Sequence, residues 1–93
     1  MINLICNKYW FSLIKAQEID FDYREVKKHY IDMFVDKIDD KTIKFKDIKQ
    51  VKFVDGYSKN RNEIIRNIAN IKVCMFAYKP CFILTFEPIY TKP

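Results

Sequence analysis

Two hydrophobic periods alternate along this chain, and their order constrains the fold more than any other feature of the sequence. A period near 3.6 residues predicts helices over residues 8–16 and 26–35, with Asn7 as the N-cap of the first. Apolar or alternating segments predict strands over residues 2–6, 19–23, 51–54 and 81–86. The order strand, helix, strand, helix and then several strands predicts an α+β fold whose sheet curls into a small β-barrel of five to six mostly antiparallel strands with two short helices.

Residues 19–23 alternate strictly between apolar and polar side chains, which is typical of a strand with one buried face. The apolar face, predicted to be the buried one, consists of Ile19, Phe21 and Tyr23. The other face consists of Asp20, Asp22 and Arg24, which we expect to form a row of paired charges.

The segment over residues 63–73 is ambiguous between a helix and a strand. Its isoleucines favour a helix up to Ala69, with a strand over residues 71–76 after it. Before it, residues 51–54 end at Asp55-Gly56, a turn signal that predicts a hairpin, and residues 36–41 are predicted to be a polar loop.

Length and composition predict one domain over residues 1–93. The chain has 93 residues, of which 49% are hydrophobic and 16% aromatic, enough to form a core. It has no apolar stretch long enough for a membrane span and no secretory signal at its start, so we expect a cytoplasmic protein without membrane contact. Three cysteines and one histidine lack metal-site spacing, which predicts no metal, no cofactor and cysteines that act as small core residues.

Charge is distributed unevenly along the chain, whose net charge is +5. Residues 18–40 contain eight acids and four bases, a balance of −4, whereas residues 41–93 contain eleven bases and four acids, a balance of +7. A basic half with exposed aromatic side chains suits a nucleic-acid backbone, because binding releases its counterions. The alternative is a set of solvated lysines in a chain biased towards Ile and Lys, a bias that suggests an AT-rich phage, viral or bacterial genome.

Four segments resemble the ASCH domain family of the PUA-like superfamily, and together they span nearly the whole chain. They are residues 8–18, residues 21–30 with the sequence Tyr-Arg-Glu, residues 51–57 ending in Gly-Tyr, and residues 80–86. The resemblance implies a PUA-like barrel in which residues 63–73 form a strand, against the helical period of that segment.

The family signature Gly-x-Lys-x-x-Glu-x-Arg is only half kept. Its Gly falls on Gln17, its Lys on Ile19, its acidic position on Asp22 and its Arg on Arg24. Some ASCH proteins are amidohydrolases of acylated cytidine that use this Lys as a base. Ile19 cannot transfer a proton, so the resemblance here favours a protein without that reaction.

Arg24 and Asp22 are the first candidate site residues. The Arg24 guanidinium can hold a phosphate or carboxylate in two hydrogen bonds, and Asp22 can accept from the exocyclic amine of a base; alternatively the two pair only with each other. Tyr57 can stack on a base, and Trp10, with Tyr9, can form a wall of the pocket, although both aromatics also suit a structural role. The cations predicted to hold phosphates are Lys8, Lys27, Lys28, Lys49, Lys52, Lys59, Arg61 and Arg66.

Three functions follow, in decreasing order of support. The first is non-catalytic binding of RNA or a nucleotide-like ligand near Arg24. The second is a phage or viral accessory protein that binds and inhibits a host protein, with the acidic residues 18–40 as a mimic of nucleic acid. The third is an amidohydrolase on acylated nucleosides that uses Asp22. The sequence leaves the oligomeric state open.

Overall fold

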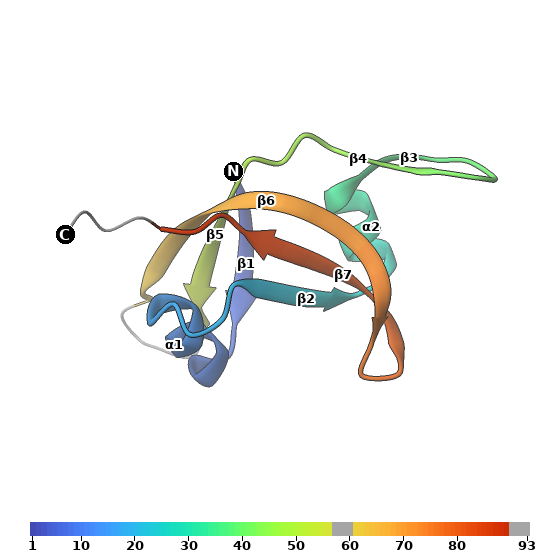
Figure 1. The fold of residues 1–93 in the computed structure, drawn as a ribbon. Helices are drawn as coiled ribbons and strands as arrows, with labels where there is room; N and C mark the ends of the chain where they lie inside the picture. Colours follow the sequence, from blue (N-terminus) through green and yellow to red (C-terminus); the bar gives the residue numbers. More distant parts are fainter. Residues whose placement is uncertain (57–60, 90–93) are drawn as a thin grey trace.

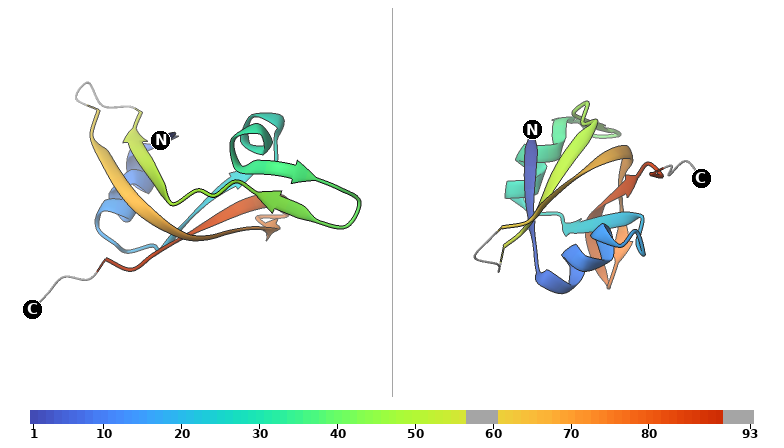
Figure 2. Two further views of the ribbon diagram at one scale, coloured as in Figure 1. Left: turned by 90° about the horizontal axis from the view of Figure 1, so that it is seen from above. Right: turned by 90° about the vertical axis from the view of Figure 1, so that its left-hand side faces the viewer.

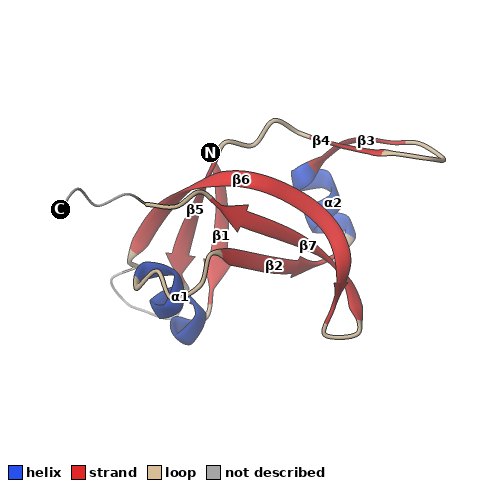
Figure 3. Ribbon diagram, viewed as in Figure 1, coloured by secondary structure: helices blue, strands red, loops and turns tan. Residues whose placement is uncertain are grey.

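The computed structural model describes residues 1–56 and 61–89, which form an α+β fold with a curled sheet. Figures 1 and 3 show the sheet wrapping around the core, with one helix near each end. The elements are β1 (Ile2–Cys6), α1 (Lys8–Lys15), β2 (Phe21–Glu25), α2 (Lys28–Phe34), β3 (Val35–Ile38), β4 (Ile43–Phe45), β5 (Gln50–Asp55), β6 (Glu63–Phe76) and β7 (Lys79–Phe86). The predicted α+β class, with its two short helices, is therefore confirmed.

The main sheet is mixed and open, so the predicted closed barrel is not found. Its strand order is β1-β5-β6-β7-β2, in which β1 and β5 are parallel and the other neighbours antiparallel. β1 and β2 are the two edges, and within the described residues no ladder joins them. β3 and β4 form a separate two-stranded sheet, which projects from the body of the molecule (Figure 2).

Residues 63–73, whose sequence was ambiguous between helix and strand, are strand throughout and belong to β6. Its first part pairs with β5 and its second part with β7, and a register shift lies between Ile68 and Asn70. Ile64 and Ile68 pack against the core on the same face of the strand, and the shift brings Ile71 to that face as well, at a spacing of three residues. A bulged strand thus produces the spacing of a helix, so the helical interpretation was wrong and the alternative of a strand over residues 63–73 is confirmed.

Both helices lie close to their predicted positions. Asn7 caps α1, since its Oδ1 accepts a hydrogen bond from the backbone N–H of Trp10 at 2.7 Å. Gln17, two residues beyond the end of α1, has a φ of 59°. α2 begins two residues later than predicted, and β3 follows it directly, so the predicted loop over residues 36–41 is partly strand.

The two faces of β2 are the reverse of the prediction. Asp22 pairs with Leu84 of β7 and Arg24 pairs with Phe82, two core residues, so the polar side chains point inward. Asp22 is only 2% exposed, whereas Tyr23 is 38% exposed. An aromatic cluster, with ring centroids 4.4–6.0 Å apart, covers the outer face; it consists of Trp10, Phe21, Tyr23 and Phe76.

The core lies inside the curl of the sheet. Its largest buried side chains include Phe34, Phe53, Phe82 and Leu84. Of the three cysteines, Cys6 and Cys81 are buried as predicted, but Cys74 is exposed. Neither helix in the described part of the chain is long and apolar enough to cross a bilayer.

Candidate ligand-binding site

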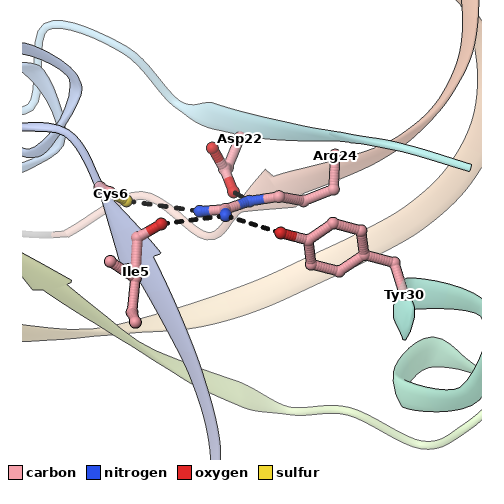
Figure 4. A network of polar contacts seen from close by, with 5 residues as sticks. All are labelled: Ile5, Cys6, Asp22, Arg24 and Tyr30. Atoms are coloured by element: carbon pink, nitrogen blue, oxygen red, sulfur yellow. Dashed lines mark hydrogen bonds and ion pairs between the residues drawn. The ribbon is translucent and has the colours of Figure 1, made fainter. Parts of the chain in front are cut away.

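Arg24 lies between the two edges of the curled sheet and contacts both. Its Nε donates to Asp22 Oδ2 on β2 at 2.8 Å, and its Nη1 donates to the backbone oxygen of Ile5 on β1 at 3.0 Å. Nη1 also donates to the Tyr30 hydroxyl at 3.2 Å, and Nη2 contacts Cys6 Sγ at 3.4 Å (Figure 4). One side chain therefore connects β2 to β1 where backbone pairing is absent.

These contacts leave Arg24 little capacity for an external anion. A guanidinium has five N–H groups, and the four contacts from Arg24 use four of them. Its side chain is 14% exposed. The main role of Arg24 in this structure is therefore to hold Asp22 and the edge of β1 in place.

Burial dominates the electrostatics around Arg24. Desolvation raises the pKa of Asp22, and attraction to Arg24 opposes the change. Burial and the nearby Asp22 charge raise the pKa of the Cys6 thiol from 9.0 to about 11, so this thiol is neutral at physiological pH. Burial alone would lower the pKa of Arg24, but the charge and hydrogen bond of Asp22 outweigh it and raise this pKa.

A hollow of about 220 Å³ opens beside the Arg24–Asp22 pair. It lies between the end of β1, the start of α1 and β2, and its lining residues are Ile5, Cys6, Asn7, Trp10, Asp22, Tyr23 and Arg24. Among the described residues the buried Trp10 Nε1 has no partner at hydrogen-bond geometry, although the indole lies close enough to Asp22 to oppose the rise in the pKa of that carboxyl. The hollow thus combines a carboxylate acceptor, an indole donor and aromatic rings.

The structure brings together three of the predicted site residues, namely Arg24, Asp22 and Trp10. Lys8 is exposed on the first turn of α1, next to Asn7. The exposed Lys27 lies 3.5 Å from Glu25, and Lys52 on β5 lies 3.4 Å from Glu63.

The remaining predicted residues are dispersed. Arg61 is exposed just before β6, while Tyr57 and Lys59 lie outside the described residues. Tyr9 and Lys49 are exposed, and Lys28 pairs with Asp32 at 3.2 Å. Arg66 is 3% exposed, so its placement among solvent-facing cations was wrong.

Sequence reasoning missed three of the residues that contact Arg24. Ile5 contributes a backbone oxygen, which has no side-chain signal, and Cys6 reads as an ordinary core residue. Tyr30 shares the apolar spacing of α2, which hides the polar use of its hydroxyl. Asn7 also lines the hollow, but the sequence predicted it only as the N-cap of the first helix.

The geometry defines a small α+β protein with a curled open sheet and a partly open hollow beside a buried ion pair. No family model, curated protein or solved structure matches this chain. In the described ranges, no group of three or more His, Cys, Asp and Glu side chains is placed to hold a metal ion.

Proposed function

We propose that this chain binds RNA or a nucleotide-like ligand without catalysis, with one base in the hollow beside Arg24 and Asp22. The observation that carries the proposal is a buried carboxylate at the wall of an open hollow that is also lined by Trp10, whose buried indole N–H has no hydrogen-bond partner among the described residues. An unpaired base offers a donor and an acceptor side by side on its pairing edge, together with a ring face for aromatic contacts. Asp22 accepts from that edge, and the Trp10 N–H donates to it.

In this proposal Arg24 is a positioning residue. Its Nε donates to Asp22 Oδ2 at 2.8 Å, and because each carboxylate oxygen can accept more than one hydrogen bond, Asp22 can still accept from a ligand. The exposed Lys8 and Lys27 on the neighbouring elements supply phosphate contacts. The same proposal includes further ligand contacts from Tyr57, Lys52, Lys59 and Arg61.

Two positions support the proposed ASCH resemblance and the absence of catalysis. Gln17, at the position of the family glycine, has a φ of 59°, a conformation that glycine adopts without strain. Ile19, at the position of the family lysine, lines a different hollow, together with Arg66. The Ile19 side chain cannot act as a base, and it does not line the hollow beside Asp22.

The single tryptophan provides a direct test. Titration with nucleosides and short single-stranded RNA at low salt is expected to change Trp10 fluorescence, and the affinity for RNA is expected to fall as salt rises. Asp22→Asn is expected to weaken binding about tenfold, because it removes the charged acceptor. Asp36→Asn, an exposed change on β3, is the matched control and is expected to bind as the native chain does.

A second variant protects the test against misfolding of Asp22→Asn. Trp10→Phe retains an aromatic ring and removes the N–H, and its binding is measured by calorimetry. The proposal is wrong if the native chain binds none of these ligands at low salt. It is also wrong if folded Asp22→Asn and Trp10→Phe bind as tightly as the native chain.

A further inference from the structure

Arg66 is a buried cation without an acidic partner. It lies on β6, is 3% exposed and makes no salt bridge with any described residue. Its Nη1 and Nη2 donate long hydrogen bonds to the backbone oxygens of Ile14 and Glu87, at 3.3 and 3.4 Å. Its buried Nε has no hydrogen-bond partner in residues 1–56 and 61–89. Burying an unneutralised charge is unfavourable, so this arrangement calls for a reason.

A hollow of about 240 Å³ lies directly beside this guanidinium. The polar residues of its lining are Gln17, Asp20 and Arg66. The apolar residues are Ile19, Phe86, Pro88 and Ile89. The Phe86 ring packs against the guanidinium at 4.7 Å from its centroid. Burial lowers the pKa of Arg66, and the Asp20 charge opposes this only in part.

The carbonyl contacts of Arg66 do not account for its burial. The Ile14 oxygen already accepts a hydrogen bond from the backbone N–H of Gln17 at 3.1 Å, so it has a partner without Arg66. Glu87 is exposed, which leaves its carbonyl within reach of water. An apolar side chain of similar volume would fill the same space without the desolvation penalty.

Asp20 restricts the class of ligand that fits. Arg66 and Asp20 both line the hollow and interact electrostatically, but they are not within ion-pair distance of each other. A simple anion would complement Arg66 and be repelled by Asp20. A molecule with a carboxylate and an adjacent ammonium group complements both side chains.

We propose that the hollow beside Arg66 binds a small zwitterion of the α-amino carboxylate class. The ligand carboxylate contacts Arg66, the ammonium group contacts Asp20, and an apolar side chain packs on Phe86, Pro88 and Ile89. The site is separate from the hollow beside Arg24, since the two share no lining residue.

Calorimetry and thermal melting with L-leucine and L-phenylalanine test this proposal. Both amino acids are expected to bind and to raise the melting temperature. N-acetyl-leucine, without the ammonium charge, and leucinamide, without the carboxylate, are expected to bind about tenfold more weakly. Inorganic phosphate is expected to bind more weakly than leucine. Tighter binding of phosphate, or binding of none of these compounds, would overturn the proposal.

Two variants test the charge of Arg66 and the charge of Asp20 separately. Arg66→Met is expected to abolish leucine binding and, without ligand, to melt at the native temperature or above. Asp20→Asn is expected to weaken leucine binding while strengthening phosphate binding, and it changes only an exposed side chain. Asp36→Asn, an exposed change on β3 far from this hollow's lining residues, is the control and is expected to bind leucine normally. If Asp20→Asn leaves the affinities for leucine and phosphate unchanged, the proposal is wrong, whether or not Arg66→Met folds.

Discussion

Arg24 and Arg66 are two mostly buried guanidinium groups in one small sheet, and they differ in their surroundings. Arg24 has the Asp22 carboxylate at 2.8 Å and three further contacts, whereas Arg66 has two long bonds to backbone oxygens and an unpartnered Nε. A hollow opens beside each of them. The contrast shows that burial alone does not define the role of an arginine, because the partners decide whether its charge is already neutralised.

The two hollows are therefore expected to bind different ligands. Where the chain itself neutralises the cation, the carboxylate beside it is the group that remains for a ligand. Where the cation has no acid of its own, the guanidinium remains for a ligand. The two arginines are therefore expected to respond differently to removal of their charge.

The largest effect is expected from Arg24→Met. This variant leaves Asp22 buried without its cation, which is expected to lower the free energy of unfolding by about 3–5 kcal/mol. Urea denaturation followed by circular dichroism measures the loss. The double variant Asp22→Asn/Arg24→Met is expected to recover part of it. A loss below about 1 kcal/mol would show that the two arginines do not differ in this way.

A pH effect of intermediate size is expected from Cys6, which contacts Arg24. Its thiol is buried near Asp22, Arg24 and Asp55, and its pKa is raised from 9.0 to about 11. Between these values the unfolded chain loses the thiol proton and the folded chain keeps it, so stability falls as the pH rises. The expected loss is roughly 2–3 kcal/mol, complete by about pH 11.

The measurement compares native and Cys6→Ala chains by urea denaturation at several pH values from neutral to alkaline. Because the two chains differ only at Cys6, the difference between the two curves isolates the thiol. Parallel curves would mean that the surroundings of Arg24 do not perturb Cys6.

The smallest effect is expected beside Arg66. Gln17 has a left-handed φ of 59° and lines the same hollow. Gln17→Gly removes the steric cost of this conformation, and we expect a gain of about 0.5–1 kcal/mol after the entropy cost of glycine. Thermal denaturation measures the gain, with Lys15→Gly as a control that is expected to destabilise the helix. A loss of stability in Gln17→Gly would show that the Gln17 side chain itself supports the hollow.

Much of the secondary structure follows from local sequence. The Asn7 cap, the helical spacing of Phe11 and Ile14, and the strand after Pro80 are present in the structure. The buried face of β2 is a different matter. Alternation separates two faces but does not say which one is buried, and here Trp10 and Phe76, distant in sequence, cover the outer face.

The candidate sites were predicted only in part for similar reasons. Asp22 and Arg24 are conspicuous in the sequence, but their main partner on β1 is a backbone oxygen. Arg66 alternates with Ile64 and Ile68, a pattern that indicates an inward side chain once the segment is recognised as a strand. The helical spacing produced by the bulge in β6 hid this signal.

The connection between β1 and β2 has a consequence for how the sheet opens. In the described structure the Arg24 guanidinium, and no backbone ladder, makes the polar connection between these strands along that line. The edges can separate there without breaking any β-sheet pairing, so the first partial unfolding is expected to begin at this seam. Deuterium uptake would then be fastest at amides that face the seam, and slower in β6 and β7, which have neighbours on both sides.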